Sequence, residues 1–234
     1  MQEKRISTPD STALDEALPV MPIARTSLKQ KAAERIRQAI EKGELKPGQP
    51  ITESALARSL GIAQTTVREA FIELESQGFI ERLSPRRTRV TLLSRHHVDE
   101  IYAVRRVLEH LAVETLAGAA PDLLEGCRSA HREMTRTADI AAASRFYNAD
   151  LQFHRELWRA TGNACLADAL ERIVPKLFAF GIIRHYHPQR EKLLELAEMH
   201  GRLLDLIASG QKAAACKLMD ESMDRAWIED EQLL

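Results

Sequence analysis

Apolar residues recur at helical spacing in three short segments of the N-terminal part of the chain. The first segment is SLKQKAAERIRQAIEKGEL. The second is ESALARSL, which Thr52 can cap and Gly61 can end. The third helix follows after only three residues and runs from Gln64 or Thr65 to Gln77. Two short helices joined by a tight, glycine-containing turn predict a helix-turn-helix.

The residues on either side of this motif predict a turn and a β-hairpin. LKPGQPI, at 45–51, has the proline and glycine content that is typical of a turn. FIERL, at 79–83, and TRVTLL, at 88–93, are typical of β-strands, and the basic SPRR between them predicts the turn of a hairpin. This hairpin would form the wing of a winged helix-turn-helix.

Amphipathic helical patterns fill almost all of the second half of the chain, and Ser94 can cap the first of them. We expect helices near 95–119, 122–136, 139–160, 164–186, 188–208 and 211–231. No strand-like run interrupts them. Six helices in roughly 140 residues favour an antiparallel helical bundle.

These patterns divide the chain into three predicted parts. Residues 1–24 contain three prolines and little periodicity, which predicts a flexible tail. Residues 25–93 form the winged helix-turn-helix, and residues 94–234 form an all-helical domain. The predicted fold class is therefore mainly α, with one small β-hairpin.

Composition indicates an ordinary soluble protein, with 44% hydrophobic and 29% charged residues. No apolar stretch approaches the length of a membrane span, and MQEKRISTPD at the N-terminus lacks an apolar signal segment. The three cysteines lie far apart, in no metal-binding or redox spacing. We therefore expect a cytoplasmic protein with reduced thiols and no membrane contact.

The net charge of −1 conceals an uneven distribution. Residues 25–92 hold thirteen Lys and Arg against eight Asp and Glu, whereas residues 93–234 hold eighteen against twenty-two. A basic segment beside an acidic body is typical of a module that meets phosphate. This excess is modest, so it supports a nucleic-acid partner only together with the motif.

The start of the third helix carries polar side chains that suit DNA reading. In QTTVREA the apolar positions face the small core, which leaves Gln64, Thr65, Thr66 and Arg68 on or beside the exposed face. A recognition helix reads bases with its N-terminal residues. Gln64 can make a bidentate contact to adenine, and Arg68 can reach a phosphate or a guanine edge. The two threonines can bond phosphate oxygens or touch a thymine methyl group.

Four further residues are candidate contacts to the DNA backbone: Ser54 and Arg58 on the preceding helix, and Arg86 and Arg87 in the wing. The alternative interpretation is a simple N-cap followed by a solvated surface charge. The ordered layout of helix, turn, helix and basic hairpin favours DNA binding.

Residues 27–93 resemble the DNA-binding domain of the GntR family of bacterial regulators. The resemblance rests on IEKGELKPGQPITESALARSLGI at 40–62, TTVREAFIELESQGFIER at 65–82 and the wing at 83–93. It implies a homodimer on a double-stranded palindromic operator, usually as a repressor that a metabolite releases.

Three residues depart from the pattern of that family. Gln64 stands where arginine is usual, Thr66 where many members have proline, and Thr88 where a wing glycine is common. The operator preference of typical members therefore cannot be transferred to this chain.

One helix of the second half carries a metal-like pair of side chains. In NADLQFHREL, Asp150 and His154 are four residues apart and share a helix face, so they can chelate one divalent metal ion. His200, on a later helix, could be a third ligand. The alternatives are an ion pair on the helix surface and a hydrogen-bonded histidine in the core.

Residues 95–230 resemble the FCD-type ligand domain of the FadR subfamily, through VRRVLE at 104–109, DLQFHRELWRATGN at 150–163 and His200 followed by RLLDLIASG. The resemblance implies a site of one aspartate and three histidines. Asp150, His154 and His200 match three positions, and Ser222, a poor ligand, occupies the fourth.

Three protein ligands with an open position suit Zn²⁺, and also Ni²⁺, Mn²⁺ or Fe²⁺. The resemblance implies a small carboxylate-bearing metabolite as effector, which Arg105 could clamp. Arg105 could instead pair with Glu109 four residues on. Asn163 is expected to close a turn, and His185 and His187 to lie at the surface.

The resulting hypothesis is a dimeric transcription regulator, not an enzyme, that is released from its operator by an organic acid in a metal-containing cavity. Alternatives are a regulator with the ion itself as signal, an activator or architectural DNA binder, and a helical metallo-hydrolase. The hydrolase lacks a second carboxylate cluster and a nucleophile elbow.

Overall fold

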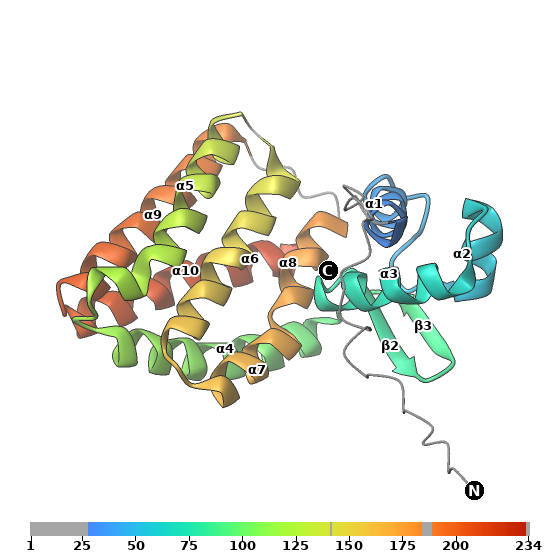
Figure 1. Ribbon diagram of the computed structural model, residues 1–234. Helices are drawn as coiled ribbons and strands as arrows, with labels where there is room; N and C mark the ends of the chain where they lie inside the picture. Colours follow the sequence, from blue (N-terminus) through green and yellow to red (C-terminus); the bar gives the residue numbers. More distant parts are fainter. Residues whose placement is uncertain (1–27, 141, 184–188, 233–234) are drawn as a thin grey trace, which may run out of the picture.

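The computed structural model describes residues 28–140, 142–183 and 189–232 (Figure 1). The predicted tail at 1–24 and the two histidines His185 and His187 lie outside these residues. The described chain consists of a head, which carries the helix-turn-helix, and a body of helices.

The head contains the helices and the hairpin that the sequence predicts. Thr52 caps the second helix, since its Oγ1 accepts a hydrogen bond from Ala55 N (3.2 Å), and Gly61 ends it in the left-handed conformation. The elements are α1 (Leu28–Glu41), β1 (Pro50–Ile51), α2 (Glu53–Leu60), α3 (Gln64–Ser76), β2 (Ile80–Ser84) and β3 (Arg87–Val90).

The strand β1 is absent from the sequence prediction, which expected only a turn at 45–51. It pairs antiparallel with β3, so the sheet has the order β1-β3-β2. A two-residue strand is too short to show an alternating pattern. Its Pro50 lacks an N–H group, and proline is confined to edge strands such as this one.

Seven α-helices and one 3₁₀ helix make up the described residues of the body: α4 (Arg95–Leu116), η2 (Pro121–Leu124), α5 (Glu125–Asp139), α6 (Ala143–Ala160), α7 (Ala164–Ile173), α8 (Pro175–Ile183), α9 (Arg190–Ala208) and α10 (Lys212–Gln232). The helix α5 packs along α6 and α9, and α10 packs along α4 and α9 (Figure 1).

The prediction of one helix over 164–186 is wrong, because two helices occupy that stretch. The second of them begins at Pro175, which has no N–H group with which to continue α7. Its sequence, PKLFAFGII, is apolar almost all round, as expected of a helix that is covered on more than one side.

The helix α8 lies between the head and the body. Its Ala179, Ile182 and Ile183 belong to the buried cluster that forms the core of the head. Its Leu177 and Phe180 belong to the core of the body. Each core is therefore completed by side chains of the same short helix.

The end of α3 makes two further contacts with the body. Gly78 has a positive φ of 81°, and a Cβ there would overlap the carbonyl oxygen of Pro175. The guanidinium of Arg155, on α6, donates to the carbonyl oxygen of Ser76 (3.0 Å) and to Glu171 (2.8 Å). A cation at the last carbonyl groups of a helix is favoured by the helix dipole.

We predict that Gly78→Ala destabilises the protein more than Gly61→Ala does. Both residues have positive φ, which costs an alanine roughly 1–2 kcal/mol. A Cβ at Gly61 meets no atom within 4 Å, whereas one at Gly78 meets the backbone of α8, which adds roughly 1–3 kcal/mol. Chemical denaturation of both variants measures the difference. An equal loss of stability in the two variants would mean that the close approach of Gly78 to the backbone of α8 has no energetic effect.

Candidate nucleic-acid interface and candidate metal centre

The predicted DNA-contacting residues lie on α2, on α3 and at the turn of the β2–β3 hairpin. On α3 four apolar residues are completely buried, whereas Gln64, Thr65 and Arg68 are exposed and Thr66 is half-buried; the buried residues are Val67, Ala70, Phe71 and Leu74. The four residues predicted to contact the DNA backbone, Ser54, Arg58, Arg86 and Arg87, are all exposed. The side chains are thus available to a ligand, as the sequence pattern requires.

One acidic residue of this surface was missed by the sequence reasoning. Glu53, the first residue of α2, accepts hydrogen bonds from Gln64 Nε2 (3.2 Å) and from Arg68 Nε (3.1 Å). The hydrogen bond from Arg68 holds the pKa of Glu53 below its usual value. Glu53 is eleven residues from Gln64 and fifteen from Arg68, so these contacts depend on how α2 packs against α3 and no local sequence pattern predicts them.

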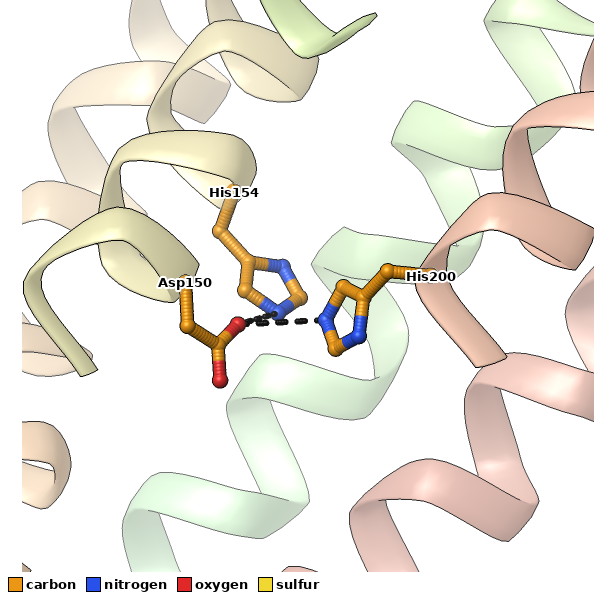
Figure 2. A group of neighbouring side chains, drawn as sticks. All are labelled: Asp150, His154 and His200. Carbon is orange, nitrogen blue, oxygen red and sulfur yellow. Dashed lines mark ion pairs between the residues drawn. The ribbon is translucent and has the colours of Figure 1, made fainter. Parts of the chain in front are cut away.

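Asp150, His154 and His200 converge inside the body. Figure 2 shows the first two projecting from α6 and His200 from α9 toward one point. Asp150 Oδ1 lies 3.1 Å from His200 Nε2 and 3.6 Å from His154 Nε2. All three side chains are buried, so a surface ion pair is excluded as an interpretation of these residues.

The Nδ1 atoms of the two histidines, which face away from the cluster, both lie near acceptor oxygens. His200 Nδ1 lies 2.7 Å from the carbonyl oxygen of Leu196, and His154 Nδ1 lies 3.0 Å from Glu109 Oε1. His154 Nδ1 is close enough to Glu109 Oε1 for an ion pair, but the two groups are not aligned for a hydrogen bond. A proton on each Nδ1 leaves each Nε2 lone pair directed at the cluster, which is the arrangement of metal sites.

The donor set fits a divalent metal ion. The three ligand atoms lie within 4.8 Å of one another, and no donor is aligned for a hydrogen bond to the buried Asp150 Oδ1. A buried carboxylate oxygen without a hydrogen bond is costly, and a cation would satisfy it. The group can therefore hold a metal.

Burial and neighbouring charges act in opposite directions on the two carboxylates. Burial raises the pKa of Asp150, but His200, His154 and Arg105 together outweigh it and the net shift is downward. Burial also raises the pKa of Glu109, but His154 and Arg105 outweigh it and lower that pKa to about 2. Both groups are thus ionised at neutral pH, the state that metal binding needs.

Arg105 makes the contact with Glu109 that the sequence offered as one alternative, and it also contacts His154. Its Nε lies 3.3 Å from Glu109 Oε1, and its Nη2 lies 3.1 Å from His154 Nε2. Its guanidinium also lies over the ring of Phe178, 5.5 Å from the centroid. The arginine is therefore paired with Glu109 and at the same time faces the candidate ligands.

A cavity of about 80 Å³ opens beside this cluster. Its lining includes the three candidate ligands, Arg105 and Ser222, the residue at the predicted fourth ligand position. Pockets for drug-sized molecules measure roughly 300–1,000 Å³. This cavity is smaller than that range, so it suits a metal ion with a small acid beside it.

Two residues near the cluster have structural roles. Asn163, which the sequence predicts to close a turn, caps α7 through a hydrogen bond that its Oδ1 accepts from Leu166 N (3.1 Å). Trp158 donates from Nε1 to Glu109 Oε2 (3.0 Å), a contact that the sequence pattern did not predict. Glu109 is thus held by side chains from two helices.

Two family models match this chain. Residues 28–90 match "Bacterial regulatory proteins, gntR family", and residues 100–225 match the FCD domain. The chain belongs to the GntR family and carries an FCD domain. Its members are DNA-binding transcription regulators, so the hydrolase alternative is excluded.

Curated relatives support this family assignment. A probable D-xylose utilization operon transcriptional repressor of Paenarthrobacter nicotinovorans is 29% identical over 82% of this chain and 84% of its own length. The gluconate operon transcriptional repressor of Bacillus licheniformis is 27% identical over 78% of this chain and 74% of its own length.

Solved structures share the fold of this GntR chain. McbR/YncC of E. coli has a TM-score of 0.68 at 20% identity, covering 89% of this chain and 99% of that one. A putative GntR regulator from Rhodococcus sp. RHA1 has a TM-score of 0.67 at 20% identity, covering 87% of this chain and 97% of that one.

Among the described residues, no helix is long and apolar enough to cross a membrane.

We predict that His154→Ala removes bound metal without unfolding the body, because it deletes one of three ligands while the hydrophobic core stays intact. Elemental analysis after incubation with Zn²⁺ measures the metal content. It should be about one ion per chain in the wild-type protein and near zero in His154→Ala. The control is His96→Ala, whose imidazole is 80% exposed. Full metal content in His154→Ala, with unchanged circular dichroism, would rule out the site.

Proposed function

We propose that this protein is a homodimeric repressor that a small organic acid releases from a palindromic operator in the cytoplasm. The observation that carries the proposal is the buried cluster of Asp150, His154 and His200 with Arg105 beside it. This cluster lies in a cavity whose wall includes α8, the helix that also completes the core of the head.

The charges of the cavity favour an anionic effector. Arg105 is cationic, Glu109 and Asp150 are anionic, and all three are buried. A divalent ion held by Asp150, His154 and His200 would leave one net positive charge, which is costly in a buried site unless an anion neutralises it. Such an ion supplies a Lewis-acidic position for a carboxylate oxygen, and Zn²⁺, Ni²⁺, Mn²⁺ and Fe²⁺ suit the donor set.

Arg105 has the second role in this proposal. Its Nη2 lies at His154 Nε2, and one lone pair cannot serve both an arginine and a metal ion. When His154 ligates a metal, Nη2 of Arg105 is released and can form a bidentate pair with the effector carboxylate together with Nη1, while Nε stays paired with Glu109. The names of the relatives, a gluconate operon repressor among them, favour a sugar acid.

The homodimer is supported by an exposed apolar face on α4. Val104, Val107 and Leu111 follow one another at intervals of three and four residues, so they share one face of the helix. Their exposed fractions are 50%, 68% and 44%. A second copy of the chain would cover this stripe and set the spacing of the two heads on successive major grooves.

The coupling between cavity and head is proposed to run through α8 and the linker at 91–98. Leu177, Phe178 and Gly181 line the cavity, and Ile182 packs in the head. An effector that favours one position of α8 would shift the population of head arrangements. The domain division at 93/94 and the DNA-contacting residues belong to this proposal.

We predict different effects for two variants of α3. Arg68→Ala should weaken binding to all duplexes, whereas Gln64→Ala should mainly relax discrimination at one base pair, by about tenfold. The control is Arg132→Ala, an exposed arginine of the body. Fluorescence anisotropy with a selected operator and a random duplex measures both affinities. Equal losses on both duplexes for Gln64→Ala would contradict base reading by this residue.

We also predict that Zn²⁺ with D-gluconate or a related sugar acid lowers operator affinity at least about tenfold, a typical allosteric coupling. Removal of the metal with a chelator, or Asp150→Asn, should abolish the response. A full response to Zn²⁺ alone would favour the ion itself as the signal. Binding of the acid without any change in operator affinity would overturn the effector role.

A further inference from the structure

The acidic side chain of Glu53 lies among the residues proposed to read DNA. Its carboxylate accepts hydrogen bonds from Gln64 Nε2 (3.2 Å) and Arg68 Nε (3.1 Å), and Arg68 Nη2 lies 3.0 Å from its Oε2. Glu53 is the less exposed partner of the ion pair with Arg68: 19% of its side chain is accessible to solvent, against 56% for Arg68. An anion on a DNA-facing surface opposes phosphate binding, so its position there calls for a function.

The position of Glu53 is determined by α2. Thr52 caps that helix, so Glu53 is the first helical residue, where the helix dipole favours a negative charge. Gln64 and Arg68 are four residues apart and share one face of α3. A single carboxylate at the start of α2 therefore contacts both side chains across the turn of the motif.

The chemistry of the carboxylate decides how the amide of Gln64 is oriented. An ionised carboxylate only accepts hydrogen bonds, so it must face the NH₂ group of Gln64 and not its oxygen. One N–H of the amide is then used, which leaves one N–H and Oε1 for a base.

This remaining pair of groups matches one purine. Adenine offers one donor and one acceptor in the major groove, which a single N–H and one oxygen can satisfy together. Guanine offers two acceptors, which would need two free N–H groups. With one N–H held by Glu53, the bidentate contact to guanine is lost.

We propose that Glu53 is a positioning residue that sets the base preference of Gln64 to adenine and limits binding of this protein to unrelated DNA. The inference rests on the proposed function, since it requires that Gln64 face a base. Glu53 acts through the orientation of Gln64 and through partial neutralisation of Arg68, without a DNA contact of its own.

The test uses the full-length protein and a duplex selected by it from a randomised pool. Affinity is measured for this duplex, for the derivative with guanine in place of the adenine opposite Gln64, and for a random duplex of equal length. Glu53→Gln should lower the adenine-to-guanine discrimination about tenfold, the size of a bidentate base contact. It should also bind the random duplex several-fold more tightly, with a steeper salt dependence, because one negative charge is removed.

Two further variants separate the carboxylate's roles. Glu53→Asp keeps the charge at the start of α2 but is one methylene shorter, so it should lose discrimination without gaining affinity for random DNA. Glu69→Gln removes an exposed negative charge from α3, so it should gain affinity for random DNA and keep its discrimination. Circular dichroism confirms that each variant is folded.

The double variant Glu53→Gln with Gln64→Ala tests whether Glu53 acts on base discrimination through Gln64. If Glu53 acts through Gln64, the double variant discriminates no less than Gln64→Ala alone. Additive losses, or unchanged discrimination in Glu53→Gln while Gln64→Ala loses it, would overturn the inference and leave the proposed function intact. A wild-type protein that selects no sequence would overturn the proposed function, and the inference with it.

Discussion

The packing of α8 between two hydrophobic cores is the contact that joins the two halves of this protein. Its Ile182 and Ile183 complete the core of the head, while its Leu177 lies in the core of the body and lines the cavity. Removing one such buried aliphatic side chain typically costs about 2–5 kcal/mol. The head is therefore anchored to the body by buried side chains, and α8 connects the cavity wall to the core in which the buried face of α3 also packs.

The second constraint is the buried charge of the body. Arg105, Glu109 and Asp150 lie within the helices, where an unpaired charge is far more costly than at the surface. Glu109 is satisfied by Arg105, Trp158 and the nearby His154, whereas Asp150 Oδ1 has no aligned donor. This difference distinguishes a carboxylate that supports the site from one that is available to a cation.

Membership in the GntR family establishes what kind of protein this is, and the individual residues decide how it differs from its relatives. Gln64, which Glu53 contacts, begins α3 where arginine is usual in the family, and Ser222 lines the cavity at the position where the resemblance implies a fourth ligand. Under the proposed function, operator preference and metal affinity depend on these positions, so neither is transferred from the family.

The sequence by itself determined the elements whose signals are local. Thr52 and Gly61 mark the two ends of α2, and the spacing of Asp150 and His154 places them on one helix face. The family motifs are likewise recognisable from the sequence alone. Only the tertiary structure decided that β1 pairs with β3, that α8 serves both cores, and that Glu53 reaches Gln64. These contacts join residues from different elements, and periodicity along one element carries no information about the neighbour that its side chains meet.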